Sequence, residues 1–515
     1  MTDHEARSLR GVARGGAIGM VGAAVSALSG FLLVAVITNT YSKHVAGVFF
    51  SATSIFVVAS AVTAMGTEAG LGRFLLRFEA TRRFADVRVV LRAAFVPVVV
   101  VSVVVGLAMV AGARPIADLA GLGDDGAAIV AVLGVTLPFA VVGSLCLATT
   151  RGFGQMRWTV FIDKIFRSAV QPLAALVTGL LGLGILALTV GWALAYVLAG
   201  VVAIVTLRRF YRRREASYTD SEPPAPRQEI VGQFWSFTWP RSVAQVSQMV
   251  IQRADIIIIA ALLGPASAAV YTAATRFMMI GQFGTQAVQQ AVQPRFTDLI
   301  ARGEHAALGT VFRISTAWSM AMAWPLYLVV GFAPHVYLSL FGSGYADDGR
   351  TVVLFMVGAM LFAVFSGPVD TLLLMSGRST TSLFNSLVAL ALDLVLCFVL
   401  IPRMGIAGAA VAWTVAIVTR CTLAFVQVHR MWGINPFCVP TLIVASLNAV
   451  CFAAPVAVLS LTTDAGLFAL CAVAVAGGLA YLAGLWFFRK PLMLSTFRAL
   501  RARRPSPTPS EVASR

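Results

Sequence analysis

Five polar side chains recur on one face of an apolar stretch that spans residues 233–263. Their successive spacings of four, three, four and three residues place all five on one side of a helix. Hydrocarbon cannot hydrogen-bond to such groups, and each uncompensated one costs several kcal/mol there. We therefore expect this face to meet protein or a water-filled cavity. The five residues are Arg241, Gln245, Gln248, Gln252 and Asp255.

The next apolar stretch, 267–293, carries a second polar face with spacings of seven, four, three and four residues. The short connection at 264–267 makes the two stretches antiparallel neighbours. Polar faces of this kind either join helices through hydrogen bonds or line a cavity, and two stripes in phase favour the cavity. The second face consists of Thr275, Gln282, Gln286, Gln289 and Gln293, with Arg276 next to Thr275.

Charged residues lie at matching depths in these two stretches. Arg253 and Asp255 come about ten residues before the connection and Arg276 about ten after it, so all three lie roughly 15 Å from its end of the helices. These depths allow an ion pair between Asp255 and Arg276. Together with Arg241, the two arginines suit a phosphate group, because a guanidinium fork matches phosphate oxygens. The glutamines suit sugar hydroxyls.

Carboxylates in other apolar segments are candidates for ion coupling. Asp393 lies in the middle of segment 380–402, where a carboxylate needs a cationic partner, water or a proton. It either couples transport to the entry of a proton or sodium ion, or pairs with an arginine. The same two alternatives, ion coupling or pairing with an arginine, apply to Asp255 and Asp370. The charges between residues 163 and 167 are instead expected at the inner interface, where long side chains reach water.

The composition requires a membrane to hold these segments. Of the 515 residues, 59% are hydrophobic and only 12% are charged, whereas a soluble domain is about half apolar and about a quarter charged. The net charge of +17 would suggest nucleic acid in a soluble protein. In a membrane protein, positive charge gathers in the cytoplasmic loops, so we expect no nucleic-acid partner.

About 14 apolar segments are long enough to cross a bilayer core of about 30 Å. Arginine-rich loops alternate with loops that carry few cations, and the arginine-rich loops are cytoplasmic by the positive-inside rule. This alternation predicts a multi-pass protein of a bacterial cytoplasmic membrane with both termini in the cytoplasm. The segments lie near residues 14–38, 43–65, 91–112, 127–149, 158–181, 184–207, 233–263, 267–293, 309–332, 351–375, 380–402, 406–428, 437–460 and 465–487.

The two halves of the chain look like repeats. Residues 46–53 echo residues 268–275, and residues 184–192 echo residues 405–413 at nearly the same offset. Repeats of six spans preserve topology, and transporters built from such repeats bind substrate between them. The expected parts are an N-terminal bundle at 1–207, a cytoplasmic linker at 208–230, a C-terminal bundle at 231–430, two further spans at 431–488 and a disordered cytoplasmic tail at 489–515.

The sequence contains no pattern for covalent or metal-assisted catalysis. It lacks a GxxxxGK[ST] nucleotide-binding motif, and its five histidines are far apart. Its six cysteines include no CxxC pair, so we interpret them as small core residues. We therefore expect a protein that is not an enzyme and that needs no cofactor or metal.

Several motifs resemble those of a known transporter group. In the second half they are Asp255 followed by IIIIAALLGPASAAVYTAATRF, the loop Leu340–Tyr345, and the segments Leu374–Arg378 and Ile401–Ala410. In the first half, Arg151–Gln155 matches more loosely. By these motifs and their order, the chain resembles the polysaccharide transporter, or oligosaccharide flippase, branch of the multidrug/oligosaccharidyl-lipid/polysaccharide exporter superfamily.

The resemblance implies two six-helix bundles of parallel repeats in a V around a central cavity, followed by two more helices. It also implies export of a polyprenyl-diphosphate-linked oligosaccharide by alternating access, for synthesis of cell-surface polysaccharide. Cationic side chains would hold the diphosphate and the polar stripes the sugars, with the lipid tail at the gap between bundles. The implied partners are this substrate, membrane lipids, and a polymerase or glycosyltransferases of the same pathway.

Three other readings stay open. An ion-coupled multidrug or small-molecule antiporter of the same superfamily would need a titrating carboxylate such as Asp255 or Asp393, although segment 14–38 contains none. A lipid II flippase is a second alternative, although that segment lacks the Arg-Asp pair associated with this branch. A membrane scaffold or polymerase subunit is the third, and polymerases usually have a large external loop, which this sequence does not show.

Overall fold

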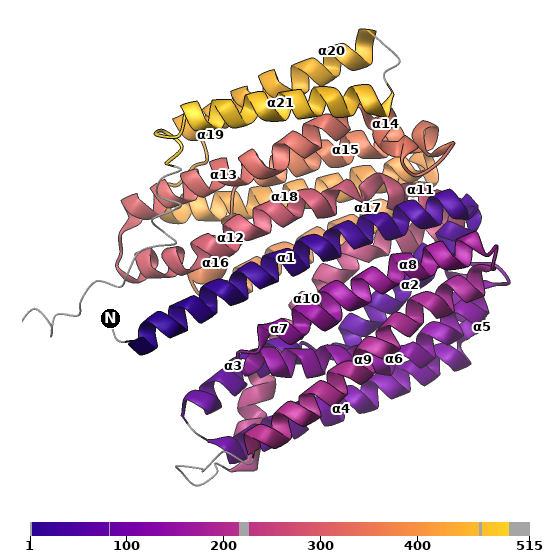
Figure 1. The fold of residues 1–515 in the computed structure, drawn as a ribbon, viewed down its shortest axis with the longest axis vertical. Coiled ribbons are helices and arrows are strands. Elements are labelled where there is room, and N and C mark those ends of the chain that lie inside the picture. The colour runs from indigo at the N-terminus through magenta and orange to yellow at the C-terminus, as the bar shows by residue number, and fades with distance from the viewer. Residues whose placement is uncertain (1–2, 82, 216–225, 463–465, 494–515) are drawn as a thin grey trace, which may run out of the picture. The chain divides into compact units, whose positions relative to one another are not determined.

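The computed structural model describes residues 3–81, 83–215, 226–462 and 466–493 (Figure 1). These residues form helices joined by turns and short loops, without strands, which confirms the predicted all-α membrane fold. Residues 216–225 of the expected linker and residues 494–515 of the expected tail lie outside the described residues.

The helices follow one another with short connections. The first ones are α1 (Asp3–Thr40), α2 (Lys43–Ala64), α3 (Thr67–Ala80), α4 (Phe84–Ala111), α5 (Ala113–Leu119), α6 (Gly126–Gly152), α7 (Met156–Trp158), the π-helix η1 (Thr159–Arg167), α8 (Ser168–Leu180), α9 (Ile185–Glu215) and α10 (Arg227–Leu263). The others are α11 (Pro265–Thr275), α12 (Phe277–Ala301), α13 (His305–Phe332), α14 (Pro334–Ser339), α15 (Tyr345–Phe365), α16 (Val369–Met375), α17 (Ser379–Met404), α18 (Ile406–Trp432), α19 (Val439–Asn448), the π-helix η2 (Ala449–Ala453), α20 (Ala454–Thr462) and α21 (Leu467–Phe487).

Helices occupy all the predicted segments, but the predicted number of spans is not reached by length and hydropathy. Among the described residues, 12 helices are long and apolar enough to cross a membrane. The two segments without such a helix are 158–181 and 267–293. The first is divided by η1 and contains three charged residues, and the second is interrupted at Arg276 and rich in glutamine. Both of these segments contain clusters of polar side chains, which lower their hydropathy below that of an ordinary membrane span.

Two compact units emerge from the packing within the chain. The first unit contains residues 1–283, 337–359 and 379–420, and the second contains residues 284–336, 360–378 and 421–515. The second unit has a core built on large side chains of α12, α13 and α16, such as Phe296, Phe312 and Leu372. The predicted division into N-terminal and C-terminal bundles stays a prediction.

The first unit contains most of the polar residues singled out from the sequence. Its α6 packs against α4 and α9, and Figure 1 shows these three long helices side by side. Helix α2 packs against α10 and α11. That contact requires a glycine, because a Cβ at Gly47 would overlap the carbonyl of Pro265. Close backbone approach of this kind fixes α10 and α11 against the first part of the chain.

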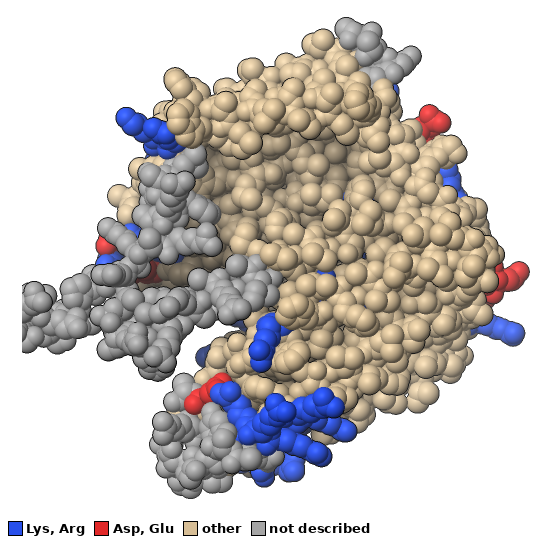
Figure 2. Space-filling model, in the orientation of Figure 1, with Lys and Arg blue, Asp and Glu red and all other residues tan. Residues whose placement is uncertain are grey.

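Exposed charge gathers near the ends of several helices. Figure 2 shows a surface that is mostly uncharged, with Lys and Arg side chains gathered near its margins. Four arginines at the end of α9 are exposed, whereas the neighbouring Arg214 pairs with Glu79. Basic side chains at a helix end, next to apolar surface, are typical of a cytoplasmic membrane boundary. The exposed four are Arg208, Arg209, Arg212 and Arg213.

Candidate functional site

The polar stripe on α10 has the exposure expected of a cavity or solvent-facing surface. Its four N-terminal members are exposed, although α10 buries many apolar side chains on its other faces. Asp255 differs, because only 4% of it is exposed. The stripe therefore divides into an exposed part that can meet substrate and a buried carboxylate. The exposed members are Arg241, Gln245, Gln248 and Gln252.

Asp255 is held by a tyrosine on the adjacent helix. The hydroxyl of Tyr271 donates a hydrogen bond of 2.6 Å to Oδ2 of Asp255. The tight turn between α10 and α11 brings the two together, and Gly264 makes this turn with a φ of 88°, which L side chains rarely adopt. In the described residues no ion pair joins Asp255 to Arg276, so the structure does not form that expected pair.

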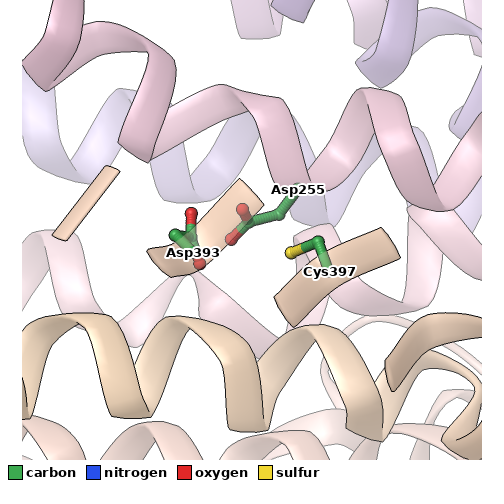
Figure 3. Close-up of side chains that lie close together, drawn as sticks. All are labelled: Asp255, Asp393 and Cys397. Carbon is green, nitrogen blue, oxygen red and sulfur yellow. The ribbon is translucent and has the colours of Figure 1, made fainter. Parts of the chain in front are cut away.

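A second carboxylate faces Asp255 from α17. One ligand atom from each of Asp255, Asp393 and Cys397 lies within 4.8 Å of the other two. Figure 3 shows the two carboxyl groups turned toward one another, with the Cys397 thiol beside them. Asp393 and Cys397 are four residues apart and therefore share a face of α17. We call these three residues the carboxylate site.

The carboxylate site has unused hydrogen-bonding capacity. Asp393 is fully buried, and neither of its carboxylate oxygens has a hydrogen-bond partner among the described residues. The Oδ1 atom of Asp255 is likewise without one. Two neighbouring buried carboxyl groups cannot both ionise unless a cation compensates them, so the arrangement favours a shared proton or a bound cation. Carboxylate oxygens suit hard cations, and the thiol adds a softer atom.

The arginines expected to bind phosphate lie in the first unit in different surroundings. Arg276 is half-buried and donates from Nε to the carbonyl of Thr272 at 3.1 Å. Arg253 lies close enough to Arg276 for their charges to repel, and its buried Nε has no partner among the described residues. Two neighbouring guanidinium groups of this kind attract an anion. Arg241 instead lies 5.1 Å from the ring of Phe237.

The second predicted stripe is divided between the units. Thr275 is buried, and its hydroxyl donates to the carbonyl of Tyr271, which is a structural role. Gln282 belongs to the first unit, whereas Gln286 and Gln289 belong to the second. Gln286 is exposed and Gln289 is half-buried. Asp370, the third candidate for ion coupling, lies on α16 in the second unit.

Sequence reasoning missed two members of this site. Tyr271 was not singled out, because an apolar, tight-turned segment gives no sign of which tyrosine bonds to which carboxylate. Cys397 was interpreted as a core residue, which its burial supports, but it also borders the carboxylate site. Its position four residues after Asp393 was the available signal.

Comparisons with known proteins agree with this architecture. A family model described as "Polysaccharide biosynthesis protein" matches residues 47–348, which is more than half of the chain. No curated protein was found to match the sequence.

Three solved structures illustrate the shared fold. The lipid II flippase MurJ, in an inward closed conformation, has a TM-score of 0.72 at 11% identity, covering 92% of this chain and 99% of that chain. An inward-facing multidrug resistance MATE family transporter has a TM-score of 0.63 at 14% identity, covering 79% and 94%. A transporter of the same superfamily from Pyrococcus furiosus has a TM-score of 0.55 at 16% identity, covering 82% and 96%.

At these identities the likeness shows the fold alone, while the family match runs from within α2 to the first residues of α15. The fold, the apolar helices and the family match agree with one another. The chain therefore belongs to the polysaccharide biosynthesis protein family, with a fold similar to that of the lipid II flippase and multidrug transporter structures.

Proposed function

We propose that this protein moves a polyprenyl-diphosphate-linked oligosaccharide across the bacterial cytoplasmic membrane by alternating access, for synthesis of cell-surface polysaccharide. The observation that carries the proposal is the exposed polar face of α10, with one arginine and three glutamines on a helix that is long and apolar enough to cross a membrane. Amide groups both donate and accept hydrogen bonds, as sugar hydroxyls do. Such a face suits a glycan and is too polar for lipid.

The diphosphate requires cationic groups, and the first unit supplies them. Within the described ranges, the Nε of Arg253 has no hydrogen-bond partner, and its neighbour Arg276 keeps part of its guanidinium available beyond the bond to Thr272. A pair of guanidinium groups can bind phosphate oxygens in a bidentate manner. We therefore assign Arg253 and Arg276 to the diphosphate, and Gln245, Gln248 and Gln252 to the sugars.

The carboxylate site supplies a means of coupling. Asp255 and Asp393 are suited to take up and release a proton or a monovalent cation, because their free oxygens gain most from such an ion. Asp255 lies on the same helix as the polar face, two residues after Arg253. Occupancy of the carboxylate site can thereby influence the helix that contacts substrate. Glycosyltransferases that build the substrate and a polymerase that consumes it are the partners this function implies.

The test is an Arg276→Ala variant in cells that depend on this protein for surface polysaccharide. Loss of a charged hydrogen-bonding group from a phosphate site costs about 1.5–3 kcal/mol, which corresponds to a roughly 10- to 150-fold loss of export. Lipid-linked repeat units should then accumulate on the cytoplasmic side, as measured by mass spectrometry and leaflet-selective labelling. Arg92→Gln, which removes an exposed arginine on α4, is the matched control and should export normally. Normal surface polysaccharide with Arg276→Ala would contradict the proposal.

A coupled antiporter for drugs or other small molecules is the second candidate, because the carboxylate site suits ion exchange equally well. Deletion of the protein distinguishes the flippase function from the antiporter function. Accumulated lipid-linked oligosaccharide with unchanged drug sensitivity supports the flippase, and the reverse supports the antiporter. Accumulation of lipid II in the same extract would instead assign the protein the substrate named for the structurally similar MurJ.

A further inference from the structure

A polar pocket lies entirely within the first unit, apart from the residues assigned above. It has a volume of about 270 Å³ and is lined by residues of α3, α6, η1 and α9. We call it the Lys164 pocket. Three cations and two carboxylates line it, together with two hydroxyl groups, one tyrosine and several small residues. Its polar and charged members are Glu68, Ser144, Arg151, Thr159, Asp163, Lys164, Arg167 and Tyr196.

The π-helix η1 presents most of the charged groups to this pocket. A π-helix has a wider turn than an α-helix and occurs frequently at functional sites. Asp163 and Arg167 are joined across one turn of η1 by a bond of 2.7 Å, and the hydroxyl of Ser168 donates to the carbonyl of Asp163 at 3.1 Å. The first contact fixes the side chains of Asp163 and Arg167 against each other, and their expected position at the inner membrane interface stays a prediction.

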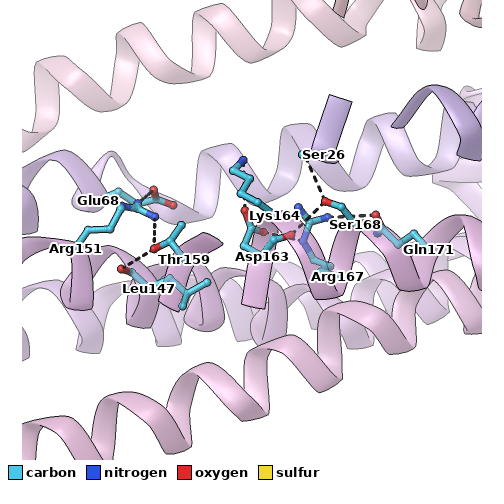
Figure 4. Close-up of polar contacts among 10 residues, drawn as sticks. All are labelled: Ser26, Glu68, Leu147, Arg151, Thr159, Asp163, Lys164, Arg167, Ser168 and Gln171. Atoms are coloured by element: carbon cyan, nitrogen blue, oxygen red, sulfur yellow. Dashed lines mark hydrogen bonds and ion pairs between the residues drawn. The ribbon is translucent and has the colours of Figure 1, made fainter. Parts of the chain in front are cut away.

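Two groups of contacts form the charged wall, as Figure 4 shows. In one, Arg151 bonds Glu68 at 2.9 Å and Thr159 at 3.3 Å. In the other, Asp163 is shared by Arg167 and by Lys164, whose Nζ lies 3.4 Å from Oδ2. One carboxylate thus serves two cations, so the walls carry one positive charge more than negative.

Of the three cations in the pocket walls, Lys164 has the fewest contacts with acceptor groups, so we assign the excess positive charge to it. Arg167 already has Asp163, the amide oxygen of Gln171 at 3.3 Å and the face of Tyr196 at 4.6 Å. For Lys164 the described residues provide only the longer contact to Asp163, and 41% of its side chain is exposed. An ammonium group donates three hydrogen bonds. Lys164 is therefore the cation in this pocket that has capacity left for an anionic ligand.

Small residues keep the pocket open opposite these charges. Gly143 of α6 and Gly200 of α9 approach so closely that a Cβ on Gly143 would lie 2.8 Å from the Cα of Gly200. Ala140, Ser144 and Ala199 continue this wall without long side chains. At about 30 Å³ per water molecule, the volume corresponds to roughly nine waters. That is room for one sugar ring with its substituents.

Tyr196 of α9 borders the charged wall of the pocket. The guanidinium of Arg167 lies 4.6 Å from the centre of its ring, and Arg253 is within electrostatic reach of it.

We propose that the Lys164 pocket binds an anionic group, a carboxylate or a phosphate, carried by a sugar residue of the transported glycan. This proposal rests on the proposed flippase function and adds that the substrate is acidic beyond its diphosphate. The Lys164 ammonium contacts the anion, Ser144 and Thr159 contact neighbouring hydroxyls, and Glu68 and Asp163 keep the other cations in place. Charge-assisted bonds of this kind are short and strong.

The experiment measures the melting temperature of the full-length protein in lipid nanodiscs. The probes are sodium glucuronate, sodium phosphate and, at equal ionic strength, glucose with sodium chloride. Binding to the folded state raises the melting temperature according to occupancy, so glucuronate, phosphate or both should raise it and glucose should not. A response to glucuronate alone that Lys164→Gln removes identifies a carboxylate ligand, and a response to phosphate alone that Lys164→Gln removes identifies a phosphate ligand. A phosphate response that persists in Lys164→Gln belongs to Arg253 and Arg276.

Three variants locate the response. Lys164→Gln should weaken anion binding about tenfold or more, and Lys164→Arg should retain it. Ser144→Leu fills the pocket without changing its charge and should abolish the part of the response that depends on Lys164. Arg92→Gln, which removes an exposed cation elsewhere in the first unit, should respond like the unaltered protein.

Three results would overturn the proposal: no response to either anion, an equal response to glucose, or an unchanged response in both Lys164→Gln and Ser144→Leu. The flippase function is tested separately, by accumulation of lipid-linked intermediates in deletion cells. Accumulation without an anion response rejects the Lys164 pocket alone. An anion response without accumulation rejects the flippase function and, with it, the assignment of the anion to a transported glycan.

Discussion

The carboxylate site and the Lys164 pocket lie in the same unit and treat buried charge in opposite ways. In the pocket, each carboxylate is bonded to at least one cation. In the carboxylate site, two acidic side chains face each other, and three of their four oxygens have no hydrogen-bond partner among the described residues. In the Lys164 pocket every carboxylate is therefore paired and one cation is in excess. In the carboxylate site the acidic groups have no cation to balance them among the described residues.

This difference has a physical meaning. A buried polar atom without a partner costs about 1–3 kcal/mol, so Asp255 and Asp393 destabilise the fold unless an ion or proton compensates them. An ion pair already formed gains little from a further ligand, and breaking it is costly. The carboxylates Asp255 and Asp393 therefore serve function at the expense of stability. Most of the ion-paired residues of the Lys164 pocket serve stability.

The largest expected effect comes from Asp393→Asn. The amide keeps the shape of the carboxyl group but removes its charge, so ion coupling is lost and export falls roughly 5- to 150-fold, the range of a coupling free energy of about 1–3 kcal/mol. The melting temperature should stay the same or rise. Export in proteoliposomes and thermal unfolding in nanodiscs provide the two readings. A large fall in stability would show that Asp393 has a partner in the fold.

The same chemical change in the Lys164 pocket should have the opposite outcome. Asp163→Asn removes the counter-ion of both Arg167 and Lys164 and leaves two cations close together. Because 26% of the Asp163 side chain is exposed, solvent reduces the cost to about 2 kcal/mol of the free energy of unfolding. Denaturation of the variant beside Lys43→Met, which removes a more exposed ion pair with Asp348, checks this. Equal effects of the two changes would contradict the comparison.

Tyr271→Phe should have the smallest effect. It removes one hydrogen bond to Asp255 and no charge, so the free energy of unfolding should fall by about 1–2 kcal/mol, with export reduced only a few-fold. The unfolding free energies of Tyr271→Phe, of Asp255→Asn and of the double variant, each compared with the unaltered protein, give the coupling between the two residues. No coupling in this cycle would mean that the bond does not stabilise Asp255.

The sequence predicted the helices and the polar face of α10 well, because periodicity is a local property. Arg241, Gln245, Gln248 and Gln252 are exposed together as their spacing indicates. The number of spans stays a prediction, because the segments with Asp163 and Arg276 combine membrane length with polar residues and do not meet the length and hydropathy of a span among the described residues.

Partners across helices could not be predicted. Asp255 was matched with Arg276 from their depth alone, but depth does not fix rotation about the helix axis, and that rotation places Tyr271 and Asp393 against Asp255 instead. The Lys164 pocket was missed for a related reason. Its residues come from α3, α6, η1 and α9, and the wide turn of η1 breaks the regular spacing on which helix periodicity depends.

The boundary between the two units has a mechanical consequence. It falls inside three long helices: within α12 after Phe283, within α15 after Ala359 and within α18 after Arg420. These helices are continuous across the boundary, so each contributes residues to both units. Gly281 and Gly284 flank the point in α12, and Gly358 lies beside the point in α15. Glycine lowers local helix stability by roughly 1 kcal/mol relative to alanine. Two of the three helices are therefore locally weakened at the point where they pass from one unit to the other.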